Sequence, residues 1–329
     1  MPAPGSSKTA IVFGGAGFIG TRLLSELVKS GQYGRLVSAD LNDVARKVEG
    51  VEYVRADVRQ PIAIPGEFPD AEVYNLAAVH TTPGHEDWEY FWTNVLGALR
   101  ICAFADAIGA HRMIFLSSIS VYGPTEAPLD EDGTLSPESA YGRSKYQAEE
   151  IHRAWRRVAA GRQLVIVRPA VIFGPGERGN FTRMAALLKG GRFVYPGRTD
   201  TVKSCAYVGE LVRSIGFVRD LGREETTYNL AYPARYTTRD ICAAFAAVAG
   251  YRMPRLIVPM WLMLLGGLAF EVLAAIGMKT SVNRGRVMKL FRSTNIVPSV
   301  LTQLGYSFET DLEEGLRRWK TESPSGEFV

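Results

Sequence analysis

A glycine-rich turn between an apolar strand and an amphipathic helix is the feature of this sequence that most limits its fold. The segment TAIVFGG (9–15) predicts a buried strand, and FIGTRLLSELVKSG (18–31) predicts the helix that follows it. Gly14, Gly17 and Gly20 stand three residues apart in the turn. The first allows a tight turn, the second lets the backbone approach a pyrophosphate, and the third lets the helix pack closely on the strand. The turn therefore predicts a unit that binds a dinucleotide.

The start of this helix and the end of the next strand predict which cofactor would bind. Phe18 and Ile19 lie in the first helical turn, where unpaired N–H groups and the helix dipole favour phosphate. Asp40 ends the second predicted strand and is placed to accept hydrogen bonds from the ribose hydroxyls. A carboxylate there would repel a 2′-phosphate, so we expect NAD rather than NADP. The adenine end is expected near Asp57 and Val58, although Asp57 could equally be a turn or cap residue.

Apolar strands alternate with helices through the first half of the chain. This order predicts an α/β fold with a doubly wound (Rossmann) parallel sheet, covered by helices on both faces. Two long helices are expected over 88–109 and 139–161. The further strands are expected over 35–40, 51–57, 72–78, 112–118, 163–169 and 226–232.

The sequence pattern changes after Pro169. The regular alternation of apolar strands and helices gives way to segments rich in glycine, proline and charged residues. We expect a smaller, mostly helical C-terminal region that binds the substrate. The dinucleotide-binding domain is placed over 8–173 and is rejoined by about 206–240. The substrate-binding region is placed over 174–205 and 241–329.

Composition and charge exclude some classes of function. The chain is 47% apolar and 22% charged, as in a folded globular protein, and its net charge of +4 is small for 329 residues. A dedicated nucleic-acid surface is therefore not expected. The three cysteines are far apart and form neither a disulfide framework nor a CxxC metal site, and MPAPGSSKTA lacks the apolar stretch of a secretory signal. A reducing cytoplasm is the expected location.

Two interpretations stay open for the apolar segment LIVPMWLMLLGGLAF (256–270). It is uncharged for 15 residues but contains Pro259 and the pair Gly266-Gly267. A membrane-spanning helix needs about 20 apolar residues, so we expect a buried helix or one that lines an apolar pocket. A peripheral contact with a membrane is the alternative.

The segment YGRSK (141–145) places a tyrosine and a lysine on the same face of a predicted helix, four residues apart. A phenol ordinarily titrates at about pH 10, and a neighbouring cation stabilises the phenolate and lowers its pKa. Such a tyrosine can take a proton from a hydroxyl as hydride leaves. A pair of this kind is also typical of an ordinary surface helix. The strand before it, FLSSISVYG (115–123), favours chemistry, because it exposes serine hydroxyls at the edge of the sheet where ligands bind.

The ordered set of the glycine turn, NLAA (75–78), SSISVYG and YGRSK resembles the extended short-chain dehydrogenase/reductase family, in its NAD-dependent nucleotide-sugar epimerase/dehydratase group. The resemblance covers about residues 8–240 clearly. It implies a nucleotide-sugar substrate and an enzyme that transfers hydride.

The resemblance also implies the catalytic residues. Ser118 would polarise the substrate oxygen, and Tyr141 would be the acid and base. Lys145 would hold the nicotinamide ribose and depress the pKa of the tyrosine. Ser117 and Ser120 are the rival hydroxyls.

Further family positions surround the cofactor. Leu76, Ala77 and Ala78 would run beside it, and Asn94 would support the backbone of the active site. In this family the two long helices form a four-helix contact, so a homodimer is expected.

The substrate residues are less clearly implied. The family usually has an asparagine three residues after the arginine of VRP, and Val171 stands there instead. Later segments resemble a branch that makes amino- and deoxy-sugar nucleotides for surface polysaccharides. That branch implies Asn180 at the diphosphate, with Arg183 or Lys203 adding charge-assisted contacts, although a solvated loop suits them equally. Tyr207 is expected either near the cofactor or substrate, or in the core.

The expected reaction is epimerisation at C4 of a nucleotide sugar by transient hydride transfer. The alternatives are a 4-keto-sugar reductase and a hydroxysteroid-type dehydrogenase that acts on an apolar alcohol. Asp40 favours the epimerase, whereas the apolar segment 256–276 favours the dehydrogenase. A 4,6-dehydratase is not expected, because Ile119 and Ser120 follow Ser118 where that subgroup has an Asp-Glu pair.

No metal site is expected, because the histidines do not fall into ligand spacing with one another or with cysteines. His80 follows the NLAA strand near the expected active site. A contact with the substrate there competes with a solvated loop histidine. Ser120 is a further candidate for a substrate contact.

Overall fold

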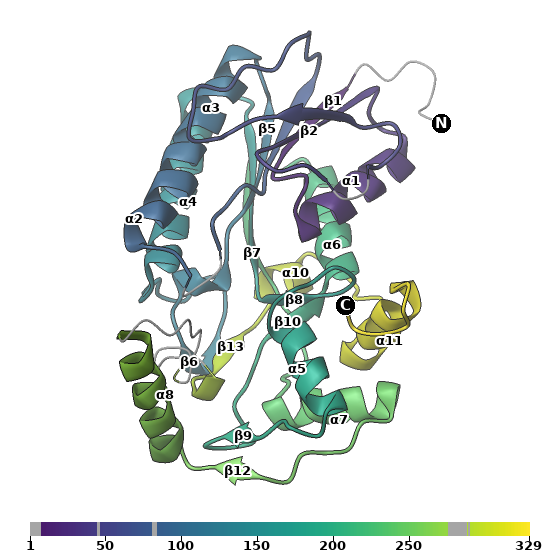
Figure 1. Ribbon diagram of the computed structural model, residues 1–329. Helices are drawn as coiled ribbons and strands as arrows, with labels where there is room; N and C mark the ends of the chain where they lie inside the picture. The colour runs from purple at the N-terminus through teal and green to yellow at the C-terminus, as the bar shows by residue number, and fades with distance from the viewer. Residues whose placement is uncertain (1–7, 45–46, 81–83, 276–287, 289) are drawn as a thin grey trace.

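The computed structural model describes residues 8–44, 47–80, 84–275, 288 and 290–329 (Figure 1). Its centre is a seven-stranded sheet in the order β11-β7-β5-β4-β1-β2-β3, and every neighbouring pair is parallel. The predicted doubly wound α/β fold is confirmed. The strands are β1 (Thr9–Phe13), β2 (Arg35–Asp40), β3 (Glu52–Arg55), β4 (Ala71–Asn75), β5 (Arg112–Leu116), β7 (Gln163–Pro169) and β11 (Glu225–Leu230).

Helices cover both faces of this sheet (Figure 1). One face is covered by α1 (Phe18–Ser30) and α6 (Val208–Asp220), and the other by α3 (Gly97–Ala107) and α4 (Ala140–Val158). All five residues of β1 are buried, because its side chains meet a helical layer on either side. This double burial explains why the sequence shows apolar runs in place of an alternating pattern.

The first long helix is interrupted. The segment predicted as one helix over 88–109 forms α2 (Asp87–Tyr90), a π-helical stretch η1 (Phe91–Leu96) and then α3. A π-turn of this kind often occurs at functional sites.

The second region contains short parallel strand pairs and helices. It begins where the chain leaves β7, and Figure 1 shows it beyond the C-terminal end of that strand. An aromatic core that includes Phe173 and Trp319 joins its helices. The pairs are β8 (Val171–Phe173) with β10 (Cys205–Tyr207), β9 (Tyr195–Pro196) with β12 (Ile257–Val258), and β6 (Thr125–Leu129) with β13 (Thr294–Ile296). The helices are α5 (Asn180–Lys189), α7 (Thr238–Ala249), α8 (Met260–Ala275), α10 (Ser299–Gln303) and α11 (Leu312–Glu322).

The apolar segment is a helix, but the expectation that it is buried is wrong. Helix α8 lies at the periphery of the second region (Figure 1). Trp261, Leu262, Leu265 and Leu268 are exposed on it. Within the described ranges, no helix is both long and apolar enough to cross a membrane.

Candidate active site

The glycine turn is as tight as its spacing predicts. Gly14 has φ +82°, and a Cβ there would lie 2.7 Å from the carbonyl carbon of Leu76. A Cβ on Gly20 would overlap the Gly14 carbonyl oxygen, so helix α1 can pack against the turn only with glycine at this position. Gly17 is the N-cap of α1 and donates its N–H to the Gly14 carbonyl at 3.2 Å. Bare backbone at the start of α1 fits the pyrophosphate of a dinucleotide.

Asp40 lies beside this turn, at the end of β2. One carboxylate oxygen accepts the N–H of Ala16 at 3.0 Å, and the other accepts the N–H of Asn42 at 2.9 Å. These bonds fix the carboxylate next to the start of α1. This is the position from which a carboxylate can accept the ribose hydroxyls of NAD.

The residues proposed for the adenine end have structural partners. Asp57 accepts two hydrogen bonds from Arg59 at 2.8 Å, and the guanidinium holds the pKa of this carboxyl below its usual value. Asp57 also accepts the backbone N–H of Arg59, which is the turn role weighed from the sequence. Val58 is buried against Gly97, where an added Cβ would lie 2.9 Å from the valine side chain.

Ser118 and Tyr141 come together at the C-terminal edge of the sheet. A hydrogen bond joins the side chains of Tyr141 and Ser118. Ser118 also donates to the hydroxyl of Ser120 and accepts its backbone N–H, both at 3.1 Å. Ser117 points into the core instead and donates to Glu149 at 2.6 Å. Of the three candidate hydroxyls, Ser117 is therefore turned away from Tyr141.

The glycine after the tyrosine has a local reason. A Cβ on Gly142 would overlap the backbone oxygen of Ser120, so only glycine lets α4 approach this loop so closely. Ser139 caps α4 by accepting the N–H of Gly142 at 3.1 Å. The close approach and the cap together place Tyr141 in the first turn of α4, beside Ser118.

The expected acidification of the phenol is not what the structure shows. Burial raises the pKa of Tyr141 to about 12, and its hydrogen bond with Ser118 offsets only part of this rise. Lys145 is also buried, and burial lowers its pKa to about 7. Its ammonium donates to the carbonyl oxygen of Leu116 at 2.7 Å and lies 4.8 Å from the ring centre of Phe115. Burial is the main cause of both shifts, so the structure does not show the predicted depression of the tyrosine pKa.

Asn94 holds the backbone that follows β4. Its side-chain oxygen accepts the N–H of Val79 at 2.9 Å, and its amide nitrogen donates to the Val79 carbonyl at 3.1 Å. The same nitrogen donates to Ser144 of α4 at 2.9 Å. Asn94 lies in the π-helical stretch η1. Its side chain therefore connects the backbone after β4 to α4 through hydrogen bonds.

A buried ionic network beneath the site was not identified from the sequence. Glu149 is fully buried and accepts two hydrogen bonds from Arg168, at 2.9 and 2.7 Å. Arg168 also donates to the hydroxyl of Tyr122 at 2.7 Å, and that hydroxyl donates to Asn229 at 2.9 Å. The available signal was the position of Glu149 four residues after Lys145, which puts an acid on the face of α4 that carries the tyrosine and the lysine.

The substrate candidates are spread over the second region. Asn180 and Arg183 are exposed in the first turn of α5. Lys203 donates to the carbonyl oxygen of Arg292 at 2.6 Å, and burial lowers its pKa to about 8. Partial burial and the charge of Lys145 lower the pKa of His80, which places this histidine near the active-site lysine.

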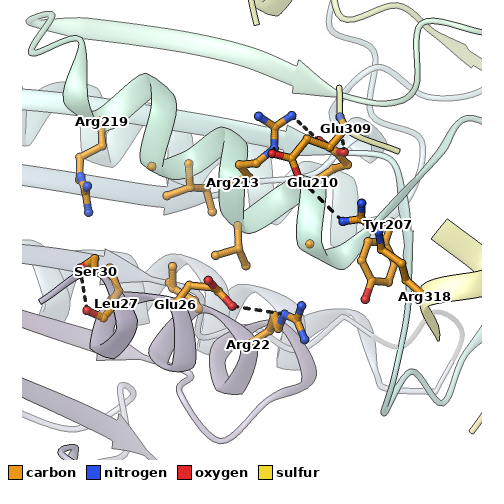
Figure 2. Close-up of a pocket in the computed structure, with 15 residues that line it drawn as sticks. Arg22, Glu26, Leu27, Ser30, Tyr207, Glu210, Arg213, Arg219, Glu309 and Arg318 are labelled. Atoms are coloured by element: carbon orange, nitrogen blue, oxygen red, sulfur yellow. Dashed lines mark hydrogen bonds and ion pairs between the residues drawn. The ribbon is translucent and has the colours of Figure 1, made fainter. Parts of the chain in front are cut away.

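Tyr207 packs in the core of the second region and not beside Ser118 and Tyr141. Its side chain is buried, and its hydroxyl donates to Glu322 at 2.8 Å. It also lines a groove between α1 and α6, where the arginines form ion pairs with neighbouring acids (Figure 2). None of the three predicted catalytic residues lines this groove. Among the described residues, no group of three or more histidine, cysteine or acidic side chains could hold a metal ion.

The parallel sheet, its glycine turn, and the serine, tyrosine and lysine at its C-terminal edge are the features of a short-chain dehydrogenase/reductase. The chain matches the model of the NAD dependent epimerase/dehydratase family over residues 10–231, and it belongs to that family. The predictions of family and cofactor are thereby confirmed.

Individual relatives are similar over different lengths. The chain is 29% identical over 326 residues to the N-acetyl-alpha-D-glucosaminyl-diphospho-ditrans,octacis-undecaprenol 4-epimerase of Escherichia coli O157:H7, covering 95% of this chain and 94% of that protein. It is 27% identical to a UDP-glucose 4-epimerase of Vibrio cholerae, over 62% of this chain and 64% of that protein. The fold resembles that of a Thermus thermophilus UDP-glucose 4-epimerase in complex with NAD, with a TM-score of 0.72 and 21% identity, covering 94% and 97% of the two chains.

Proposed function

We propose that the chain is an NAD-dependent 4-epimerase that acts on a hexose, or an amino- or deoxyhexose, attached to a nucleoside diphosphate. The observation that carries the proposal is the hydrogen bond between Tyr141 and Ser118 at the sheet edge beside the glycine turn. Membership of the epimerase/dehydratase family and the names of the two curated relatives support the reaction and the substrate class.

The residues divide the work as follows. Gly14, Gly17 and Asp40 would hold NAD, which when bound accepts a hydride and later returns it. Tyr141 takes the proton of the sugar hydroxyl at its phenolic oxygen and gives it back, and the hydroxyl of Ser118 orients the same sugar oxygen. Because the pKa of Tyr141 is about 12, the phenol is protonated at neutral pH. It must lose this proton before it can take that of the sugar hydroxyl, and it is suited to donate a proton to the sugar oxygen when the hydride returns. Asn180 and Arg183 are the proposed contacts for the diphosphate.

Isotopic labelling distinguishes the epimerase from the reductase. Purified protein should interconvert the two C4 epimers of a UDP-hexose without added reduced cofactor, and deuterium at C4 should remain in the product. Tyr141→Phe should abolish this conversion. Tyr146→Phe, one turn further along α4 and partly exposed, is the matched control and should retain it.

Other outcomes would replace the proposal. A reaction that consumes stoichiometric NADH or NADPH with a 4-keto-sugar would identify a reductase. Turnover of a sterol alcohol, with none on UDP-, GDP- or dTDP-sugars, would identify the hydroxysteroid-type dehydrogenase instead.

A lipid, in place of a nucleoside, is a second candidate for the group that carries the sugar diphosphate. One observation favours it, the exposed apolar residues of α8. The Escherichia coli relative, which matches along nearly the whole chain, is named for a sugar linked to undecaprenol through a diphosphate. A polyprenyl diphosphate presents the same two phosphates as a nucleotide but a lipid in place of the base. Comparing conversion of UDP-sugar and polyprenyl-diphosphate-sugar with one enzyme preparation decides between the carriers.

We also propose that the chain forms a homodimer through α2, η1, α3 and α4. Trp88, Trp92 and Leu99 are exposed on the first three of these elements. The rings of the two tryptophans pack edge to face, with their centroids 5.9 Å apart. An exposed apolar surface of this kind is typical of an interface.

We place the protein in the cytoplasm. Its three cysteines are buried free thiols, as expected of a protein in a reducing compartment: Cys102, Cys205 and Cys242. Extracting the protein from fractionated cells of its source would test this location.

A further inference from the structure

Helix α8 is apolar on the face that is turned to solvent. Trp261, Leu262, Leu265 and Leu268 stand at i, i+1, i+4 and i+7, which is one side of a helix, and they are 64%, 48%, 54% and 42% exposed. A surface helix ordinarily carries polar residues on this side. Other residues of this stretch are less exposed: Gly267 is buried, and Met260, Met263 and Leu264 are half-buried.

Two more exposed apolar residues precede the helix in the chain. Leu256 and Ile257 are 60% and 47% exposed at the start of β12. Together with the four residues of α8 they form one contiguous stretch of chain, which we name the α8 surface. Exposed apolar surfaces that collect several large side chains mark contacts with a membrane or with another protein.

The charge of the surrounding sequence favours a membrane. From Ile241 to Phe308 the chain contains seven basic residues and a single acid, Glu271. The whole chain has 38 basic and 34 acidic residues, so its positive charge is concentrated in this segment. Arg252 and Arg255 are exposed immediately before the α8 surface. Basic side chains beside an apolar face attract the anionic headgroups of a bilayer.

We propose that the α8 surface docks on a lipid bilayer that contains anionic lipids. The helix has 16 residues and so is about 24 Å long at 1.5 Å per residue, which is shorter than the roughly 30 Å hydrocarbon core. It therefore lies in the interface with Trp261 among the headgroups, where tryptophan is favoured. The inference goes beyond the proposed function and does not depend on it.

The position of the α8 surface determines how the docked protein would be oriented on the membrane. In Figure 1, α8 lies with the second region, on the side of the sheet where β7 ends. Ser118 follows the C-terminal end of β5, and Tyr141 lies in the first turn of α4. Docking would keep the substrate-binding region at the membrane and leave the dinucleotide-binding sheet on the far side, in water.

Sedimentation of the full-length protein with vesicles tests the proposal. Wild-type protein should pellet with vesicles made of equal parts phosphatidylglycerol and phosphatidylcholine. It should pellet less with pure phosphatidylcholine. The double variant Trp261→Glu with Leu265→Glu should lower the partition coefficient on the order of tenfold or more. The matched control is Val158→Glu, which changes a side chain that is 78% exposed at the end of α4 and should bind as wild type does.

Two milder measurements separate a docking defect from a folding defect. Arg252→Gln and Arg255→Gln should each weaken binding to the anionic vesicles about fivefold, and added salt should reduce the difference. Brominated lipids should quench tryptophan fluorescence of the wild type, and Trp261→Phe should remove most of that quenching. Circular dichroism and thermal unfolding of each variant report whether it remains folded, independently of docking and of the reaction it catalyses.

Three results would overturn the proposal. One is wild-type protein that remains in the supernatant with both kinds of vesicle. Another is equal vesicle binding by the double variant and the wild type. The third is that the α8 surface binds a second copy of the chain. In that case the double variant would have a lower molar mass than the wild type in light scattering, and the wild type would not bind vesicles.

Discussion

Replacing Gly14 by alanine tests the cofactor turn, and its cost can be worked from the structure. Gly14 has φ +82°, where a side chain costs roughly 1–2 kcal/mol. The added Cβ would also lie 2.7 Å from the carbonyl carbon of Leu76 and 2.8 Å from the nitrogen of Ala77. Forcing backbone apart in a packed interior adds about 1–3 kcal/mol. The expected loss in the free energy of unfolding is therefore about 2–5 kcal/mol.

Gly109→Ala is the matched control. Gly109 has a similar φ of +66°, but nothing lies within 4 Å of a Cβ there. It should lose only the roughly 1–2 kcal/mol of backbone strain. Urea unfolding of both variants isolates the contribution of the close approach between the turn and the segment that follows β4.

Calorimetric titration with NAD completes the experiment. Gly14→Ala should weaken NAD binding at least about tenfold, because the turn must move from the position that fits the pyrophosphate. Gly109→Ala should bind NAD as the wild type does. The reasoning is refuted if the two variants lose equal stability, or if Gly14→Ala binds NAD with unchanged affinity.

Four further outcomes follow from the geometry of the site and its helices. Tyr141→Phe should lower kcat about 10²-fold or more in the epimerase assay while KM changes little, whereas an unchanged kcat would remove Tyr141 from the chemistry. Because burial lowers the pKa of Lys145 from 10.5 to about 7, the unfolded chain binds an extra proton between these pH values. The stability of wild type relative to Lys145→Met should therefore rise with pH across this window, on the order of 1 kcal/mol per pH unit in urea unfolding, and a flat difference would contradict the lowered pKa. Glu149→Gln should cost about 3–5 kcal/mol in the same assay, since it leaves a buried guanidinium without its charge partner, and a loss below about 1 kcal/mol would argue against the network. Trp92→Glu with Leu99→Glu should give a monomer by light scattering, and a wild type that is itself monomeric would refute the proposed dimer.

The sequence was sufficient to predict the sheet, because strands buried on both faces leave unbroken apolar runs between helices. The prediction was least accurate at the ends of strands. Residues 72–78 were expected as one strand, but β4 ends at Asn75. Leu76 still donates its N–H to Phe13, and the chain then turns past the glycine loop. The residues that leave the sheet are the ones that approach Gly14.

Other features depend on contacts that a single sequence does not encode in any local pattern. The π-helical stretch around Asn94 has the composition of an ordinary helix, and its register is set by the bonds from Asn94 to Val79 and Ser144. In α8 the apolar residues indicated a helix correctly, but not which face would be covered. Burial of that helix was inferred from composition, and composition is the same for a buried helix and a docking surface.

The charge on Lys145 connects the buried network to the chemistry. Burial lowers the pKa of this amine, and the negative charge of Glu149 raises it. Arg168 binds Glu149 through two hydrogen bonds and neutralises much of its charge, so Glu149 cannot fully restore the lysine pKa. With a pKa of about 7, the amine is only about half protonated at neutral pH. A change at Arg168 should therefore shift the pKa of Lys145, which lies four residues after Tyr141 on α4, without contacting either residue.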